Sequence, residues 1–281
     1  MTSTTFRIGG DLNARRLGFG AMRLPTEPAP DRENALAVAR RAVELGVTLI
    51  DTAHLYGGGA NEELLAEALH PYPEGLLVTT KVGVARSTET GEWGLDARPS
   101  VLRVQVDEAL RRLRVERLEL LQLHRIDPET PLADQLGTLR ELQTEGKIGH
   151  IGLSEVTVAE LERAREIIEV VSVQNRYNLL DREHEPVLAA CEAAGIAFLP
   201  WRPVAWGTSG ERAEIAAVAT ELDVSPTQVT LAWLLGHSPA ILPIPGTARI
   251  DHLEENLAAE HLQLPSSHRD RLDRLTEQAT T

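Results

Sequence analysis

Short apolar segments alternate with longer amphipathic segments along most of the chain. Eight of the apolar segments have the length and the bounding residues that are typical of strands. They are LGFGAM (17–22), VTLID (47–51), LLVTTK (76–81), LELLQLH (118–124), HIGLS (150–154), VVSVQN (170–175), AFLPW (197–201) and AILPIP (240–245). The pattern therefore predicts eight buried strands with helices between them.

The segments between these strands begin and end as helices do. Asp31 precedes RENALAVARRAVELG, and Gly46 marks the end of that segment. Other helix starts are marked at Thr130 with Pro131, at Thr157 with Glu160, and at Ser225 with Pro226 and Gln228. The last two fit the capping box, in which two side chains satisfy backbone amides of the first turn.

Eight strand–helix units predict a (β/α)8 barrel that forms a single domain over residues 1–281. A doubly wound open sheet is the main rival, but it would need a GxGxxG turn after its first strand. The segment LGFGAMRL lacks the third glycine and does not lead into a helix. We expect TTFRIGGDLNARRLG to form a hairpin that covers one end of the barrel, and SSHRDRLDRLTEQ to form an extra C-terminal helix.

Charge and composition narrow the class of protein. The formal charge of −14 argues against a nucleic acid or an anionic membrane as partner, because both bind clustered Lys and Arg. The single cysteine, Cys191, excludes an intrachain disulfide, and the N-terminus lacks the apolar segment of a signal peptide. No apolar run reaches the roughly 18 residues of a transmembrane helix. We therefore expect a cytoplasmic protein, either a monomer or a small homo-oligomer.

Polar side chains stand where the predicted strands end, which is the catalytic end of such a barrel. The second strand ends at Asp51, with Tyr56 in the next loop, and the third and fourth end at Lys81 and His124. Of the 28 basic residues only Lys81 and Lys147 are lysines. A lysine kept against this bias indicates a task for a compact ammonium group, which arginine cannot perform.

The chain resembles the aldo-keto reductase family over nearly its whole length. The resemblance rests on LGFGAMRLP, LIDTAHLYGGGANEELLAEAL, LLVTTKVG, LELLQLHRID, GKIGHIGLSEV, VSVQNRYNLLDRE and ILPIPGTARIDHLEEN. Within the family the chain is similar to the bacterial branch of pyridoxal reductases. The resemblance implies that Asp51, Tyr56, Lys81 and His124 form a catalytic tetrad.

The chemistry of carbonyl reduction fits this set of side chains. A carbonyl needs a hydride at carbon and a proton at the developing alkoxide, and Tyr56 is a weak acid. We expect the Lys81 ammonium to lower the pKa of Tyr56, and Asp51 to keep that buried ammonium charged. A neutral His124 would orient the substrate oxygen by a hydrogen bond.

The resemblance also implies a nicotinamide site. Trp201 and Pro203 belong to it, with the tryptophan ring against the nicotinamide, and Ser154 and Gln174 would bind the carboxamide. Glu155 departs from the family, in which asparagine is common, and can only accept hydrogen bonds.

An adenosine-phosphate site is implied after the eighth strand. Its members are Gly246, Thr247, Arg249, His252, Glu255 and Asn256. His252 occupies the place where many members carry an arginine on the 2′-phosphate, and we expect Arg249 to compensate at the start of a helix. NADPH is therefore favoured over NADH.

Four loop residues are candidates for the wall of a substrate pocket: His54, Trp93, Arg202 and Trp206. The expected activity is reduction of a small aldehyde or ketone, with pyridoxal as the best single candidate. A keto-sugar or natural-product intermediate stays open as the substrate. Two other classes are a non-catalytic NADPH-binding regulatory subunit and a metal-dependent barrel enzyme, although only Asp51 and His124 resemble metal ligands at the strand ends.

Overall fold

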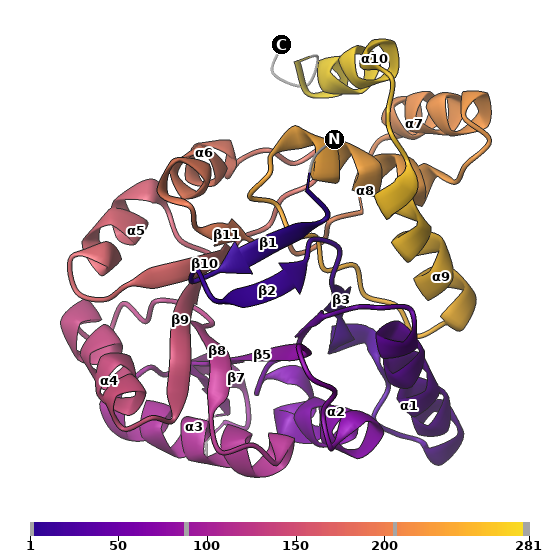
Figure 1. The fold of residues 1–281 in the computed structure, drawn as a ribbon. Helices are drawn as coiled ribbons and strands as arrows, with labels where there is room; N and C mark the ends of the chain where they lie inside the picture. Colours follow the sequence, from indigo (N-terminus) through magenta and orange to yellow (C-terminus); the bar gives the residue numbers. More distant parts are fainter. Residues whose placement is uncertain (1–2, 87–89, 205–206, 278–281) are drawn as a thin grey trace.

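The computed structural model contains a ring of parallel strands surrounded by helices (Figure 1). It describes residues 3–86, 90–204 and 207–277. Seven strands pair in chain order: β3 (Phe19–Gly20), β4 (Leu49–Asp51), β5 (Leu77–Val82), β8 (Leu118–Leu123), β9 (Ile148–Ser154), β10 (Val170–Gln174) and β11 (Ala197–Phe198). These confirm seven of the eight predicted strands and the barrel.

The eighth predicted strand, 240–245, closes the ring without forming a regular strand. On one side Leu242 N donates to Phe198 O at 2.8 Å, and on the other Gly18 N donates to Pro243 O at 2.9 Å. Pro243 and Pro245 have no N–H group, so the ladder of hydrogen bonds on either side of the segment is incomplete. The segment therefore lies where we predicted it, but the prediction of a strand was wrong.

Close backbone contact at this seam explains the glycines of LGFGAM. A Cβ atom at Gly20 would lie 2.6 Å from Ile244 O, closer than real Cβ atoms approach a carbonyl. Next to the seam, the buried Arg16 guanidinium donates from Nε to Ile241 O at 3.1 Å and from Nη2 to Ser238 O at 2.5 Å. Arg16 thus connects the start of the first strand to the last segment of the barrel.

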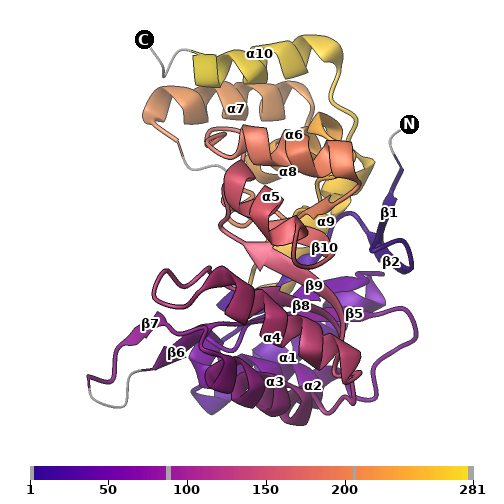
Figure 2. The same cartoon turned by 90° about the vertical axis from the view of Figure 1, so that its left-hand side faces the viewer.

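Ten α-helices of the described residues pack around this ring and above it (Figure 2). They are α1 (Ala29–Glu44), α2 (Ala60–Leu69), α3 (Pro99–Leu113), α4 (Leu132–Thr144), α5 (Val158–Arg165), α6 (Glu185–Ala194), α7 (Ser209–Glu221), α8 (Pro226–His237), α9 (Ile250–Ala258) and α10 (Ser266–Glu277). Both predicted capping boxes form, at α5 and α8. Asp31 does not cap α1, because Pro28 precedes the helix and Asp31 lies in its first turn. The extra helix α10 packs on α7.

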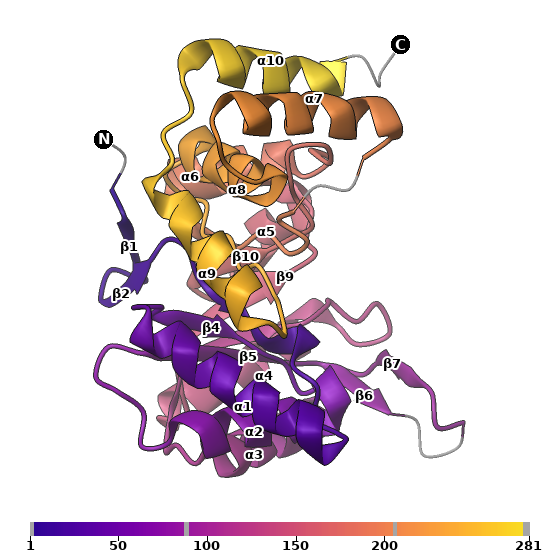
Figure 3. The same ribbon diagram turned by 90° about the vertical axis from the view of Figure 1, so that its right-hand side faces the viewer.

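Two hairpins lie at opposite ends of the barrel (Figures 2 and 3). The predicted one, β1 (Thr5–Ile8) with β2 (Leu12–Arg15), buries Ile8 and Ala14 in one cluster with Leu49 and Leu120 of the barrel strands. The other, β6 (Val84–Arg86) with β7 (Trp93–Leu95), was not predicted and follows β5, the strand that carries Lys81. Because the first hairpin fills one end, the site must lie at the other. None of the described helices is long and apolar enough to cross a membrane.

Replacing Arg16 with methionine tests the seam. The substitution keeps the apolar stem but leaves the carbonyls of Ser238 and Ile241 without their charged donor. We expect a loss of about 2–4 kcal/mol in the free energy of unfolding, measured by urea denaturation. Arg40→Met removes an exposed arginine that also donates to one carbonyl, Ala68 O, and should cost less than about 0.5 kcal/mol. Equal losses in the two variants would show that Arg16 does not hold the seam.

Candidate active site

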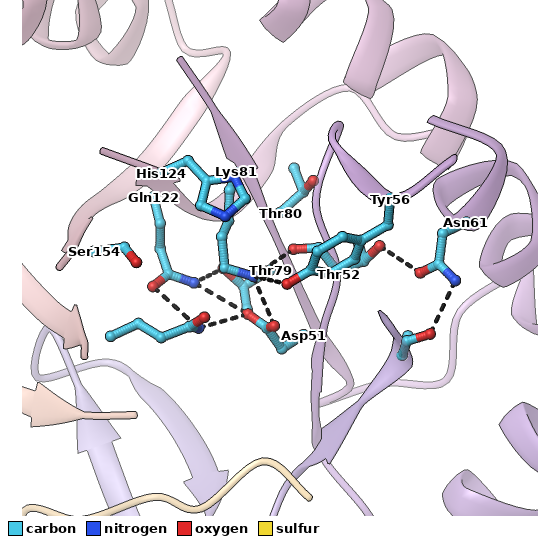
Figure 4. Close-up of polar contacts among 12 residues, drawn as sticks. Asp51, Thr52, Tyr56, Asn61, Thr79, Thr80, Lys81, Gln122, His124 and Ser154 are labelled. Atoms are coloured by element: carbon cyan, nitrogen blue, oxygen red, sulfur yellow. Dashed lines mark hydrogen bonds and ion pairs between the residues drawn. The ribbon is translucent and has the colours of Figure 1, made fainter. Parts of the chain in front are cut away.

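Four polar side chains meet at the carboxyl ends of neighbouring strands (Figure 4). Asp51 ends β4, Tyr56 begins the 3-10 helix η2 (Tyr56–Gly59), Lys81 lies near the end of β5, and His124 follows β8. Adjacent parallel strands bring these ends to one edge of the barrel, although the residues are up to 73 positions apart, from 51 to 124. The structure thus brings together all four members of the predicted tetrad.

Lys81 is at the centre of this group and is fully buried. Its Nζ donates to Asp51 Oδ2 at 2.7 Å and to Thr52 O at 2.8 Å, and it lies 3.4 Å from Tyr56 Oη. Burial acts to lower the pKa of Lys81, but the Asp51 carboxylate and the Tyr56 phenol outweigh burial and raise it. The ammonium therefore stays charged inside the barrel, as the sequence predicted.

Two glutamines complete the surroundings of Asp51. Gln174 Nε2 donates to Asp51 Oδ1 at 2.8 Å, and Gln122 Nε2 donates to the same oxygen at 3.3 Å. Both glutamines are buried and point into the barrel from β10 and β8. Sequence reasoning missed Gln122. A buried amide at an inward strand position, two residues before His124, was the available signal.

The direction of the pKa shift of Tyr56 differs from our expectation. Burial raises its pKa, and although the Lys81 ammonium lowers it, the net pKa of Tyr56 lies above the ordinary value. The phenol is therefore protonated at neutral pH in this structure. That state is the one a proton donor needs.

His124 is held in its neutral form. Burial, followed by the charges of Lys81 and Arg125, lowers the pKa of His124 to about 3. Its Nδ1 atom is buried and has no hydrogen-bond partner among the described residues. The ring stands edge-on to the Tyr56 ring, with 6.3 Å between centroids. The imidazole of His124 and the phenol of Tyr56 thus lie side by side, where both could contact a carbonyl oxygen.

A glycine turn places Tyr56 against Lys81. Gly57, Gly58 and Gly59 have positive φ angles of 64°, 64° and 94°, which residues other than glycine rarely adopt. A Cβ atom at Gly59 would lie 2.4 Å from Arg112 Nε. The turn is fixed at its base by Asn61, which accepts from Thr52 Oγ1 at 2.7 Å. The run GGG thus serves the placement of the tyrosine.

The predicted nicotinamide residues lie along the next strand ends. Ser154 ends β9, and its Oγ accepts a hydrogen bond from Arg125 Nη1 at 3.0 Å, so its own proton is free to point elsewhere. Arg125 also donates to His124 O at 2.5 Å and was missed by sequence reasoning. Its position directly after His124 was the only signal.

Trp201 and Glu155 are in direct contact. Trp201 Nε1 donates to Glu155 Oε1 at 2.5 Å. Arg202 is exposed, and its guanidinium lies 5.5 Å from the centroid of the Trp201 ring, whereas Pro203 is buried. The half-buried Trp201 ring is thus held by its edge at the end of the barrel.

The residues of the predicted adenosine-phosphate site lie just before α9 and along it. Thr247 Oγ1 accepts from Arg249 N at 3.1 Å, and Gly246 contacts β3 through a close approach to Gly20 O. The Arg249 guanidinium forms an ion pair with Asp251 through two hydrogen bonds, and this pairing lowers the pKa of Asp251 to about 2. Asn256 is buried, Glu255 is half-buried and His252 is exposed. Arg249 therefore has a competing carboxylate that the sequence did not reveal.

His54 and Trp93 line one groove, with a volume of about 950 Å³, between η2, α3 and the β6–β7 hairpin. Their rings meet edge to face with 5.8 Å between centroids. Arg112 Nη2 lies 2.9 Å from His54 Nδ1, and burial together with the Arg112 charge lowers the pKa of His54. Arg202 does not line this groove, and Trp206 lies outside the described residues.

Comparison with known proteins agrees with the fold and shows the family. The family model for the aldo/keto reductase family matches residues 16–277. An uncharacterized oxidoreductase of Schizosaccharomyces pombe is 46% identical over 94% of this chain and 87% of its own length. Pyridoxine 4-dehydrogenase of Escherichia coli is 38% identical over 99% of this chain and 100% of its own length.

Solved structures agree as well. A thermostable aldo-keto reductase in complex with the inhibitor epalrestat superposes with a TM-score of 0.87 at 27% identity, over 97% of this chain and 100% of that one. An aldo-keto reductase of Klebsiella pneumoniae in complex with NADPH gives a TM-score of 0.87 at 25% identity, over 98% and 96%. The chain belongs to the aldo/keto reductase family and is an oxidoreductase of carbonyl and alcohol groups.

The low pKa of His124 predicts how stability depends on pH. The unfolded chain takes up a proton on this side chain below its ordinary pKa of about 6.5, whereas the folded protein does so only near pH 3. Stability contributed by neutral His124 is therefore present above about pH 6.5 and is lost as the pH falls. Between pH 7 and pH 5 the free energy of unfolding of the wild type should fall by about 2 kcal/mol more than that of His124→Asn, measured by urea denaturation. Identical losses would mean that His124 titrates normally in the folded protein.

Proposed function

We propose that this chain reduces a small aldehyde or ketone with NADPH and that Tyr56 supplies the proton. The observation that carries the proposal is the contact chain from Asp51 Oδ2 to Lys81 Nζ, at 2.7 Å, and on to Tyr56 Oη, at 3.4 Å. An ammonium without a carboxylate partner would lose its charge at this depth. The pair therefore keeps a positive charge next to the one phenol that faces His124.

The side chains have distinct tasks in the proposed reaction. The cofactor, when bound, supplies the hydride to the carbonyl carbon. As negative charge develops on the carbonyl oxygen, Tyr56 Oη transfers its proton to that oxygen and becomes a tyrosinate. The Lys81 ammonium stabilises the tyrosinate, and solvent later returns the proton. Neutral His124 donates a hydrogen bond to the same oxygen and orients it.

The residues at the remaining strand ends fit NADP(H). The Ser154 hydroxyl has already accepted from Arg125, so its proton is available to the carboxamide oxygen of a nicotinamide. Trp201 offers a ring whose edge is fixed by Glu155, suited to stacking. Amides of the first turn of α9, with Thr247 and Arg249, suit the adenosine phosphates. The amide nitrogen of Gln174 donates to Asp51, so we propose that Gln174 holds the Asp51 carboxylate in place rather than binding the nicotinamide.

We propose pyridoxal as the substrate with which to begin. Pyridoxine 4-dehydrogenase of Escherichia coli covers the full length of this chain at 38% identity. The groove that is lined by Leu55 and Gly57, the chain neighbours of Tyr56, has the Trp93 ring next to His54. Such a surface favours a planar ring that carries hydrogen-bond acceptors. The test is NADPH oxidation, followed by absorbance, with pyridoxal compared with small keto sugars, and the absence of turnover with every carbonyl compound would contradict the proposal.

Tyr56→Phe should lower turnover by about 10²–10⁴-fold, because it removes only the hydroxyl that donates the proton. The ring is retained, so the affinity for NADPH, measured by quenching of tryptophan fluorescence, should stay within about twofold of the wild type. Steady-state kinetics with pyridoxal measures the loss. A variant that turns over at the wild-type rate would show that another group donates the proton.

Arg249→Ala should weaken the binding of NADPH by about tenfold and leave the binding of NADH nearly unchanged. The reason is that only NADPH carries a 2′-phosphate that the guanidinium can contact. Asp251→Asn is the matched variant: it frees Arg249 from its ion pair and should strengthen the binding of NADPH. Fluorescence titration of both cofactors measures these effects. Equal weakening of NADPH and NADH in Arg249→Ala would show that Arg249 does not contact the 2′-phosphate.

A further inference from the structure

One glutamate oxygen joins three strand ends of the barrel. Glu155 Oε1 accepts from Trp201 Nε1 at 2.5 Å and from Arg176 N at 2.7 Å. Glu155 follows β9, Arg176 follows β10, and Trp201, which bridges to Arg176, follows β11. The carboxylate is thus the common acceptor at this side of the site.

The backbone of Glu155 is held in an unfavourable conformation. Its φ of 54° lies in the left-handed region, which glycine and asparagine tolerate better than glutamate. Glu155 N is nevertheless fixed by a hydrogen bond to Gln174 O at 3.0 Å. Strained residues of this kind persist where the surrounding structure over-determines them, often at functional sites. A glutamate here, where the family commonly has asparagine, adds both reach and a negative charge.

The charges around Glu155 indicate which state of the cofactor its carboxylate would favour. The Arg125 charge interacts with that of Glu155, and the exposed Arg202 lies over the Trp201 ring. Arg176 pairs with Asp181 instead. The oxidised nicotinamide ring is positively charged, whereas the reduced ring is neutral. A carboxylate at the edge of the tryptophan that stacks on this ring therefore distinguishes the two states by charge.

We propose that Glu155 is a positioning residue with two separable effects: its oxygen fixes the Trp201 ring, and its charge makes the site bind NADP⁺ more tightly relative to NADPH. The inference rests on the proposed function, since it requires the nicotinamide to lie against Trp201. It also has a consequence for the reaction. Tighter binding of the oxidised cofactor shifts the enzyme-bound equilibrium toward the carbonyl's alcohol product by the same factor.

Two substitutions separate the effects. Glu155→Gln keeps an oxygen that accepts from Trp201 Nε1 and removes the charge, whereas Glu155→Ala removes both. The measurement is the dissociation constant of NADP⁺ and of NADPH by isothermal titration calorimetry, with no carbonyl substrate present. Glu162→Gln, which neutralises an exposed glutamate on α5, is the matched control and should leave both constants unchanged.

In Glu155→Gln we expect NADP⁺ to bind about tenfold more weakly relative to NADPH, with the NADPH constant within about twofold of the wild type. Glu155→Ala should weaken both cofactors, because the ring is no longer held. Hydrogen exchange of the indole N–H of Trp201, assigned with Trp201→Phe, should be slow in the wild type and in Glu155→Gln and fast in Glu155→Ala.

Each part of the inference has its own contrary result. An unchanged NADP⁺ to NADPH ratio in Glu155→Gln overturns the charge effect, and unchanged indole exchange in Glu155→Ala overturns the positioning effect. If the wild type binds neither cofactor, the proposed function itself fails. If it binds both and the ratio does not respond to Glu155→Gln, the proposed function stands without the charge effect.

Discussion

The buried ion pair between Asp51 and Lys81 is the interaction on which the rest of the site depends. Neither charge is stable at this depth alone, because desolvation of an isolated ion costs several kcal/mol or more. The barrel offsets that cost with further polar partners: Thr52 O for the ammonium, and Gln122 and Gln174 for the carboxylate. The two glutamines come from different strands, so the pair is satisfied only when the ring of strands is assembled. Fold and charge are thus coupled.

This dependence explains why the site uses a lysine in a chain in which 26 of the 28 basic residues are arginines. The ammonium meets three acceptors around one nitrogen, which suits a compact group and not the flat, forked guanidinium. Arginines are instead placed where a fork has two separate carbonyls to reach, as Arg16 does at the seam. Arg125 differs, because its single nitrogen Nη1 donates to both His124 O and Ser154 Oγ.

Much of the fold could be predicted from the sequence because it depends on local pattern. Alternation of apolar and amphipathic segments gave seven strands, the hairpin β1–β2 and two capping boxes. The closing segment was mistaken for a strand because its hydrophobicity resembles one, whereas its prolines remove the amides of a regular ladder. The short hairpin β6–β7 was not predicted because its strands have little apolar patterning. Asp31 resembles a helix cap in the sequence, but Pro28 is the residue before the helix, so Asp31 lies in its first turn.

The candidate site was predictable to the extent that strand ends must meet at one edge. That rule brought the tetrad together, but the roles of its members and of the cofactor residues remain predictions. Side-chain pairing across the barrel was not accessible, because the contacts of Glu155 with Trp201 and of Gln122 with Asp51 join distant positions with no shared motif. The pair Arg249–Asp251 is local, yet the sequence drew attention to the cation and not to its neighbour.

The raised pKa of Tyr56 connects the protonation of the site to the state of the cofactor. Burial keeps the phenol neutral, and an additional positive charge nearby would lower its pKa further than Lys81 and Arg125 already do. In the proposed reaction a neutral reduced nicotinamide adds no such charge, so the tyrosine would begin carbonyl reduction with its proton in place. The oxidised ring is positive and favours the tyrosinate, which is the base that alcohol oxidation requires. In the proposed reaction the same group therefore acts as acid or base according to the cofactor beside it, and the charge effect proposed for Glu155 opposes the positive charge of the oxidised ring.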